Sequence, residues 1–288
     1  MKKDSNKPKS FKGKTTGKNP DRKPQDRNRA ARNDAPPRED SGDIIYGRNT
    51  VVEAIRSGRT IDKIFAQKGE REGSIIRILG MARDKGITVV EAEKAKLDSM
   101  TQSAPHQGIV ALTTSFTYCE VDDILAYAEE KGEKPFILII DGINDPGNLG
   151  AIIRTANASG VHGIILPKRN CCGLTSTVYK AAAGACEYAK IARVVNITSA
   201  IEELKEKGVW IYGTDGAAEN DIYQTDLTGA LAIVLGDEGS GISRLVKEHC
   251  DYLIKIPMFG QITSLNISVA GAVTMYEAVR QKQQKIKS

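Results

Sequence analysis

The sequence predicts an α/β protein whose larger part is a parallel sheet covered by helices on both faces. Two short apolar runs, Phe136–Ile140 and 230–235, are continuous rather than alternating, as expected of strands that are buried on both faces. Segments with a helical apolar period alternate with further short apolar runs, which is typical of a doubly wound sheet. The 288 residues suffice for one large domain or two modest ones.

The first ordered region begins near Ile44. A short strand there precedes a helix, for which we expect Asn49 as the N-cap and Val51, Val52 and Ile55 as the apolar face. The elements expected after it are a strand at 61–66, a helix at 74–84, and strands at 87–90 and 109–112. Together they predict a small α/β module over residues 43–113.

A polar, helical connector is expected over residues 114–134, in which Val121, Ile124, Leu125 and Tyr127 form one apolar stripe. The second domain, residues 135–288, then alternates strands and helices. The expected elements are strand 136–140, helix 149–159, strand 162–166, helix 176–183, strand 193–196, helix 199–207, strands 209–213 and 230–235, helix 242–249, strand 253–256 and a last helix over 266–281.

The net charge of +5 is an average over two different regions. Residues 1–40 contain 13 basic and 6 acidic residues and half of the ten prolines, with Phe11 as the only aromatic side chain. Such a segment buries too little apolar surface to offset the entropy of ordering, so residues 1–42 are predicted to be a basic, disordered tail. It is either an arm for an RNA or DNA backbone or a solubilising extension.

The composition also excludes several classes of protein. Hydrophobic residues make up 40% and charged residues 27% of the chain, and no apolar run is long enough to span a bilayer. The lysine-rich start is not followed by an apolar segment, so we do not expect export. The odd number of cysteines and the three widely separated histidines indicate reduced thiols in a cytoplasm and no metal site.

Three polar loops follow predicted strands, where ligands of open α/β sheets bind. The loop 141–150 carries Asn148, the expected N-cap of the next helix, with Arg154 further along, and the two could hold a phosphate or orient a hydroxyl. The loop 236–241 has G-x-x-G-x-G spacing, which is neither a dinucleotide nor a P-loop motif. Its two adjacent acidic side chains favour a ligand that carries a cationic centre or a ribose diol. The loop 256–266 gathers hydroxyls and amides that can clasp a planar base.

Separately, each loop fits a plain structural role, as a capped helix, a tight turn or a polar helix cap. Together the motifs N-L-G-x-x-x-R-T-A (148–156), G-x-E-G-x-G (236–241) and I-P-M-x-G-x-x-x-S-L-N-x-S-x-A (256–270) resemble those of the SpoU (TrmH) branch of the SPOUT RNA 2′-O-ribose methyltransferases. The segments Y-G-R-N (46–49) and H-Q-G-I-V-A (106–111) resemble the substrate-binding domain of its 23S rRNA guanosine 2′-O-methyltransferases, the RlmB type. The resemblance covers about residues 44–283.

The resemblance implies a catalytic sheet with a C-terminal trefoil knot, S-adenosyl-L-methionine as methyl donor, a homodimer, and a ribose 2′-oxygen of 23S rRNA as acceptor. Neither a metal nor a membrane is implied. By position, the expected donor-binding residues are Thr214, Gly236, Ile256, Met258 and Leu265. The expected catalytic residues are Arg154, Asn148, Glu238, Ser264 and Asn266, and the expected RNA-binding residues are Arg48, Asn49, His106 and Gln107.

The roles of these residues follow in part from their chemistry. Arginine is always protonated and only donates hydrogen bonds, so we expect Arg154 to position a phosphate and the attacking oxygen. The proton acceptor stays open. Asn148 and Asn266 are expected to orient the site, and Glu238 to hold the arginine or a neighbouring network. The alternatives are a tRNA methyltransferase, a non-enzymatic RNA-binding assembly factor on the same scaffold, and a nucleotide-dependent small-molecule enzyme.

Overall fold

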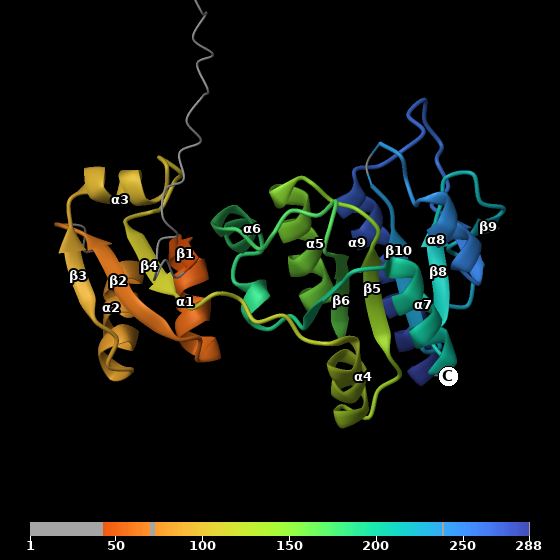
Figure 1. Ribbon diagram of the computed structural model, residues 1–288, viewed down its shortest axis with the longest axis horizontal. Coiled ribbons are helices and arrows are strands. Elements are labelled where there is room, and N and C mark those ends of the chain that lie inside the picture. Colours follow the sequence, from red (N-terminus) through yellow and green to blue (C-terminus); the bar gives the residue numbers. More distant parts are fainter. Residues whose placement is uncertain (1–42, 70–72, 238, 288) are drawn as a thin grey trace, which may run out of the picture. The chain divides into compact units, whose positions relative to one another are not determined.

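The computed structural model describes residues 43–69, 73–237 and 239–287 (Figure 1). The predicted tail, residues 1–42, and the candidate Glu238 lie outside the described residues. Within the described ranges, every helix is too short or too polar to traverse a lipid bilayer.

The first module is a four-stranded sheet with the strand order β1-β4-β2-β3. Strand β4 runs antiparallel to β1 and β2, and β2 pairs in parallel with β3. The elements are β1 (Asp43–Tyr46), α1 (Arg48–Ser57), β2 (Ile61–Gln67), α2 (Gly73–Asp84), β3 (Val89–Ala92), α3 (Lys94–Met100) and β4 (Ile109–Thr113). Every element predicted for this module is present. Helix α3 was not predicted, because its only buried residue is Leu97 and a single apolar position shows no period.

Helix α1 is capped differently from the prediction. Its N-cap is Gly47, whose φ of 95° lies in the region that favours glycine, and not Asn49, which is exposed in the first turn. The backbone N–H of Arg48 donates to Oε1 of Gln107 at 3.0 Å, so a distant loop supplies the acceptor that an N-cap side chain ordinarily provides. The prediction for Asn49 as N-cap was wrong because local sequence does not reveal such a remote partner.

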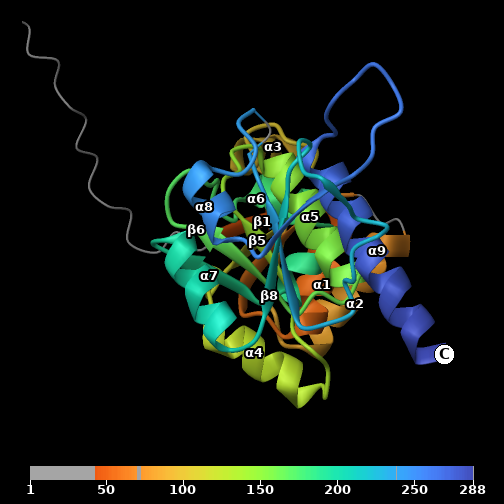
Figure 2. The same cartoon turned by 90° about the vertical axis from the view of Figure 1, so that its right-hand side faces the viewer.

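The second domain is a parallel sheet with the strand order β7-β6-β5-β10-β8-β11-β9. Figure 2 shows α7 and α8 on one side of strands β5 and β8, with α5 and α9 on the other. This arrangement confirms the doubly wound prediction. The elements after the module are α4 (Val121–Glu130), β5 (Phe136–Ile140), α5 (Pro146–Ala158), β6 (Gly163–Pro167), α6 (Ser176–Ala181), the 3₁₀ helix η1 (Ala185–Glu187), β7 (Ile191–Val194), α7 (Ile197–Glu206), β8 (Trp210–Thr214), β9 (Asn220–Asp221), β10 (Leu231–Leu235), α8 (Arg244–His249), β11 (Tyr252–Lys255) and α9 (Ile267–Lys287).

Helix α5 begins three residues earlier than predicted. Pro146 is its first residue, which suits proline because the first N–H of a helix has no partner within the helix. The N-cap is Asp145, whose Oδ1 accepts a hydrogen bond from the backbone N–H of Asn148 at 2.7 Å. The prediction of Asn148 as N-cap was therefore wrong, and its side chain instead accepts a hydrogen bond from Asn266.

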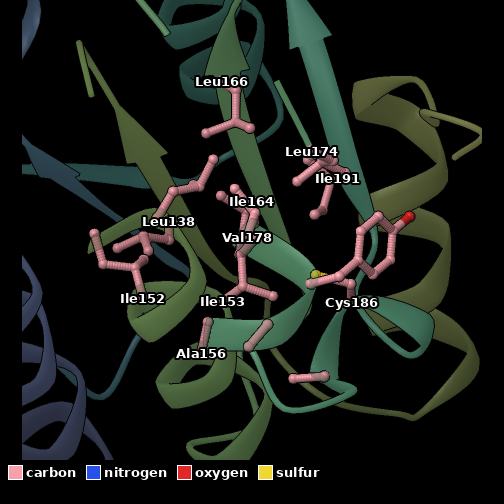
Figure 3. Packing of buried hydrophobic residues seen from close by; sticks show 14 of the residues in the cluster. Leu138, Ile152, Ile153, Ala156, Ile164, Leu166, Leu174, Val178, Cys186 and Ile191 are labelled. Carbon is pink, nitrogen blue, oxygen red and sulfur yellow. The ribbon is translucent and has the colours of Figure 1, made fainter. Parts of the chain in front are cut away.

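The strands of the second domain bury two apolar layers. Phe136, Leu138 and Ile140 of β5 belong to one layer, and Ile137 and Ile139 belong to the other. Figure 3 shows part of the first layer. There, side chains of α5 pack on β6, and the labelled residues include Ile152, Ile153, Ala156, Ile164 and Leu166.

The helix predicted within the connector is α4, and it packs on the second layer. Val121 and Ile124 are buried there, and Leu125 packs against the same cluster. The predicted apolar stripe thus covers one face of the parallel sheet. Tyr127 lies at the end of this stripe, where Lys131 and Lys190 place their ammonium groups 4.5 and 5.3 Å from the centroid of its ring.

A buried ion pair joins the first module to the second domain. Nη1 of Arg59, in the turn before β2, lies 2.9 Å from Oε1 of Glu187 in η1, and the two side chains are 8% and 6% exposed. The Arg59 guanidinium also lies 4.6 Å from the centroid of the Tyr179 ring and donates to the carbonyl of Thr114. With Asp43 of β1, whose Oδ2 lies 3.6 Å from Nη2, the guanidinium has four partners on four different segments.

The cysteines of the chain are unpaired thiols. Burial raises the pKa of Cys250 to about 12, and its Sγ donates to the carbonyl oxygen of Val246 at 3.2 Å. The Cys250 sulfur packs directly against Gly213 of β8, where an added Cβ would lie 2.8 Å from it.

Replacing Lys282 of α9 by methionine is expected to stabilise the fold at neutral pH by about 1 kcal/mol, after allowance for solvent screening of a partly exposed ammonium. Its Nζ lies 4.1 Å from the centroid of the Phe136 ring, and burial lowers its pKa from 10.5 to about 8. Between these values the unfolded state binds more protons, so the wild-type chain gains stability as pH rises through this window. The advantage of Lys282→Met should therefore be complete below pH 8 and shrink above it.

Urea denaturation of both chains at pH 7 and pH 10 measures this difference. An equal advantage of the variant at the two pH values would contradict the assignment to the charge of Lys282.

Candidate active site

A pocket of about 430 Å³ opens at the carboxyl ends of β10, β8 and β11, three adjacent strands of the parallel sheet. The turn after each strand and the first turns of α9 form its walls. The residues predicted to bind the donor all lie here, together with one predicted catalytic residue, and they are Thr214, Gly236, Ile256, Met258, Leu265 and Ser264. Residues from the 236–241 and 256–270 motifs and from the end of β8 therefore share one cavity.

The loop after β10 folds back on itself at Gly236. The backbone groups of Asp237 and Gly241 exchange two hydrogen bonds of 3.0 and 2.9 Å, which close a tight turn. A Cβ on Gly236 would lie 2.0 Å from the carbonyl carbon of Gly241. Only glycine fits beside this backbone without moving the wall of the pocket.

Replacing Gly236 by alanine is expected to weaken binding of a ligand in this pocket about 30-fold, because an overpacked site costs about 2 kcal/mol. Titration calorimetry with S-adenosylmethionine measures the loss. Gly239→Ala serves as the matched control in the same loop, since among the described residues outside its chain neighbours an added Cβ there meets only Oδ2 of Asp237, at 3.8 Å. Equal affinity of Gly236→Ala and wild type would show that the turn does not shape the site.

In the part of the chain that the structure describes, two carboxylates and one lysine, Lys255, line this pocket, so its charged side chains are net acidic. Asp215 and Asp237 both border it. The hydrogen bond from Lys247 and a second one from the Ala217 backbone N–H lower the pKa of Asp215, so it is ionised at neutral pH. Such a lining favours a ligand with cationic groups, in agreement with the sequence-based interpretation of the 236–241 loop. Among the described residues, no cluster of three or more His, Cys, Asp or Glu side chains could hold a metal ion.

In the second domain, a hydrogen bond between two side-chain amides joins the start of α5 to the start of α9. Nδ2 of Asn266 donates to Oδ1 of Asn148 at 3.0 Å. Oδ1 of Asn266 accepts from both the backbone N–H and the Oγ of Ser268, at 2.9 and 2.6 Å. Asn266 thereby caps α9 with its oxygen and holds Asn148 with its nitrogen, so two predicted orienting residues are in direct contact.

Arg154 lies elsewhere on α5. Its side chain is exposed, about two turns after the first residue of the helix, and it does not line the pocket. Within the described ranges it forms no ion pair and no hydrogen bond, which leaves its five N–H groups for a ligand. The catalytic roles of Arg154, Ser264 and Glu238 stay predictions.

The four residues predicted to bind RNA lie at one loop of the first module. Nε and the backbone N–H of Arg48 donate to O and Oε1 of Gln107, both at 3.0 Å, and Nη1 of Arg48 donates to Oγ of Ser74. Gln107 is exposed and has a φ of 56°, and Asn49 is exposed in the first turn of α1. Arg48 thus fixes the position of an exposed, conformationally unusual loop.

His106 does not present its ring on this surface. The residue is 4% exposed, its Nδ1 accepts from the backbone N–H of Gly108 at 3.0 Å, and its Nε2 contacts Oδ1 of Asp98 at 3.1 Å. Its ring nitrogens are therefore both used inside the module. These bonds hold the loop that carries Gln107, and the RNA contact at His106 stays a prediction.

Comparison with known proteins assigns both parts of the chain. The SpoU rRNA methylase family matches residues 135–276, and the family described as RNA 2′-O ribose methyltransferase substrate binding matches residues 44–119. YacO of Bacillus subtilis (strain 168), whose name places it among TrmH family tRNA/rRNA methyltransferases, is 46% identical over 240 residues, 83% of this chain and 96% of that protein. The chain belongs to the SpoU (TrmH) family of RNA methyltransferases. A TrmH family relative from Staphylococcus aureus (strain MSSA476) is 45% identical over 83% of this chain and 96% of its own.

Solved structures agree with this family. An AdoMet-bound rRNA methyltransferase from Sinorhizobium meliloti is 25% identical, with a TM-score of 0.70 over 83% of this chain and 87% of that one. The SpoU methyltransferase AviRb from Streptomyces viridochromogenes, at 22% identity and a TM-score of 0.70 over 85% of this chain and 91% of its own, shares the fold. As a SpoU family member, the chain is an S-adenosylmethionine-dependent RNA methyltransferase.

The pocket residues fit this donor. A sulfonium and an ammonium group suit the carboxylates of Asp215 and Asp237, and a planar base suits the apolar surface of Leu235, Ile256 and Leu265. The tight turn at Gly236 brings backbone close to the ligand.

Proposed function

We propose that this SpoU methyltransferase transfers the methyl group of S-adenosylmethionine to the ribose 2′-hydroxyl of a nucleotide in 23S rRNA, with guanosine as the expected nucleotide. The observation that carries the proposal is the match of residues 44–119 to a substrate-binding domain described for RNA 2′-O ribose methyltransferases. The same chain also contains a pocket whose lining suits the methyl donor. The relation to an rRNA methyltransferase of known structure supports rRNA as the substrate.

S-adenosylmethionine supplies an electrophilic methyl group when it is bound. The residues of the chain hold and orient the two reactants. Thr214, Gly236, Ile256, Met258 and Leu265 hold the donor at the strand ends. The Asn148–Asn266 pair fixes the starts of α5 and α9 beside it. A ribose hydroxyl is a weak nucleophile at neutral pH, so its orientation is the main contribution that these side chains make.

Arg154 is assigned to the RNA side of the reaction. Its planar guanidinium suits bidentate contact with a phosphate, and its permanent charge stabilises negative charge on the attacking oxygen. The exposed loop at Gln107, together with Arg48 and Asn49, is assigned to the choice of RNA site. Bases in loops and ends of RNA offer the edges that such side chains read.

We further propose that the enzyme works as a homodimer, and the exposed apolar residues around the start of α9 support this. Phe259 and Ile262 of the preceding loop are 96% and 75% exposed. Val269 and Tyr276 are 47% and 50% exposed and lie seven residues apart, on one side of α9. Such a patch is rarely left to water. Analytical ultracentrifugation should show a dimer for the wild-type chain and a monomer for Phe259→Glu combined with Tyr276→Glu.

The test of the reaction is a ribose-methylation map of 23S rRNA from cells that lack the gene, repeated after return of wild type or Arg154→Ala. We expect one guanosine to lose its 2′-O-methyl group, with recovery by wild type and not by the variant. An unchanged 23S rRNA map would contradict the rRNA substrate. A change confined to tRNA would identify the tRNA alternative, and wild-type protein that fails to bind S-adenosylmethionine would favour the non-enzymatic one.

A further inference from the structure

Three aromatic side chains form a row at the end of the sheet opposite the donor pocket. Trp210 and Tyr252 are the first residues of β8 and β11, and Tyr212 lies directly beside Tyr252 in the strand register. The rings of Tyr212 and Tyr252 are stacked, with centroids 5.3 Å apart and an interplanar angle of 18°. The Trp210 ring lies 5.8 Å from that of Tyr252. Trp210 and Tyr252 are 51% and 43% exposed.

This row is anchored in the core at one end and partly exposed at the other. Tyr212 is only 7% exposed, and its hydroxyl donates to the carbonyl of Asp226 at 3.0 Å, so it anchors the row in the core. Exposed aromatic rings held by a sheet in this way offer flat faces on which further planar groups can stack. No part of the proposed methyl transfer uses them.

A pocket of about 600 Å³ lies at the same end of the sheet. Lys134, Lys282 and Lys285 line it, with Phe136 as one of its apolar residues and Glu133 as a carboxylate. The Lys282 ammonium is half-buried above the Phe136 ring, and no described residue forms an ion pair or a hydrogen bond with it. The Glu133 carboxylate attracts this ammonium without bonding to it directly, and a partly desolvated ammonium that lacks a bonded anion favours the binding of one.

The strand register places the pocket and the aromatic row on the same face of the sheet. Leu231 of β10 pairs with Phe136 on one side and with Trp210 on the other. Register partners point to the same face, so Phe136 and Trp210 lie two strand spacings apart, about 10 Å. Cationic and stacking groups thus follow one another along the amino ends of β5, β10, β8 and β11.

We propose that this edge, defined by Lys282, Phe136, Trp210 and Tyr252, is a second RNA-binding surface that holds a single-stranded segment of the substrate. A backbone phosphate enters the pocket at Lys282, and bases stack on Trp210 and Tyr252. The combination of lysines with uncovered aromatic faces is the chemistry that binds single-stranded nucleic acid without reading its sequence. The proposal rests on the proposed methyltransferase function and adds to it an RNA-binding surface that is remote from the site of methyl transfer.

Trp210 is the only tryptophan of the chain, so its fluorescence reports directly on this surface. We expect an unstructured 12-nucleotide uridine oligomer to quench Trp210 emission in the full chain, and an RNA duplex of equal length to do so only weakly, because paired bases are not free to stack. Tyr252→Ala and Lys282→Gln should each weaken binding of the oligomer about 10-fold, as expected for loss of one stacked base or one phosphate contact.

Two matched controls lie on the opposite face of the sheet. Lys207→Gln removes a lysine that Asp122 and Glu203 already neutralise, and Leu245→Ala removes an apolar side chain that is 56% exposed. Both should bind the oligomer like wild type. Trp210→Ala is followed with fluorescently labelled RNA instead of intrinsic emission, and is expected to bind about 10-fold more weakly.

Calorimetry with S-adenosylmethionine and the rate of methyl transfer separate this proposal from the function on which it rests. Unchanged donor affinity in the variants, with a raised KM for long RNA, is the expected result. Unquenched Trp210 emission at saturating oligomer, or variants with wild-type RNA affinity and KM, would overturn this proposal alone. Absence of methyl transfer by the wild-type chain on any RNA would overturn the proposed function, whatever the oligomer result.

Discussion

Replacing Arg154 by alanine is expected to lower kcat for methyl transfer about 10²–10³-fold, the range found when one group that stabilises developing charge is removed. Donor affinity should stay within about twofold of wild type, because the side chain is exposed and does not line the donor pocket. The KM for RNA should rise as well, since the guanidinium is assigned to a phosphate. Single-turnover transfer of a labelled methyl group to RNA, combined with donor calorimetry, measures the three quantities separately.

Two further variants, Arg154→Lys and Asn157→Ala, serve as comparisons for Arg154→Ala. Lysine keeps the charge and loses the planar fork, so we expect it to restore RNA affinity more than kcat. Asn157 is an exposed residue one turn further along α5, and its replacement should leave both constants unchanged. A loss of donor affinity as large as the loss of kcat would show that Arg154 shapes the donor pocket instead.

Breaking the buried pair between Arg59 and Glu187 should have the largest effect on folding. Arg59→Met leaves the Glu187 carboxylate buried without its partner, and the expected loss is about 3–5 kcal/mol in the free energy of unfolding. Arg59→Met combined with Glu187→Leu removes both charges and should recover most of this loss, because two apolar side chains need no solvation. Urea denaturation of the single and double variants measures both values.

An exposed pair provides the control for this experiment. Arg244 and Glu248 on α8 are also bonded, at 3.0 Å, but their side chains are 81% and 52% exposed. Arg244→Met should cost less than about 1 kcal/mol. If Arg59→Met costs no more than Arg244→Met, the burial of the pair does not determine the stability of this junction.

The strands that the sequence predicts best are those that are buried on both faces. The expected range of β5 agrees with the structure to the residue and that of β10 to within one, because an apolar run of five or six residues is typical of a strand buried on both faces and too short for a helix. Strand β9 was not predicted, since Asn220 and Asp221 form it only through their pairing with β11. Its existence depends on the tertiary fold, which local sequence does not report.

The candidate functional residues likewise divide into those that the sequence predicts and those that depend on the tertiary fold. Of the five residues predicted to bind the donor, four came from the motifs and Thr214 came from the end of a predicted strand, and the strand ends bring them to one pocket, because parallel strands carry their following loops to the same edge. His106 was predicted to bind RNA, and the sequence did not reveal that Asp98 and Gly108 bond to its ring nitrogens. The aromatic row was not predicted, since Trp210 and Tyr252 lie 42 positions apart in the chain and meet only in the sheet.

The packing of Cys250 has a consequence for an enzyme that carries an activated methyl group. The cysteine thiolate is the strongest nucleophile among ordinary side chains, and Cys250 contacts Gly213, the residue before Thr214 in the donor pocket. Burial raises the pKa of this thiol to about 12, so it stays protonated at neutral pH. A buried, protonated thiol is a poor nucleophile, so we expect Cys250 not to compete with the RNA for the methyl group.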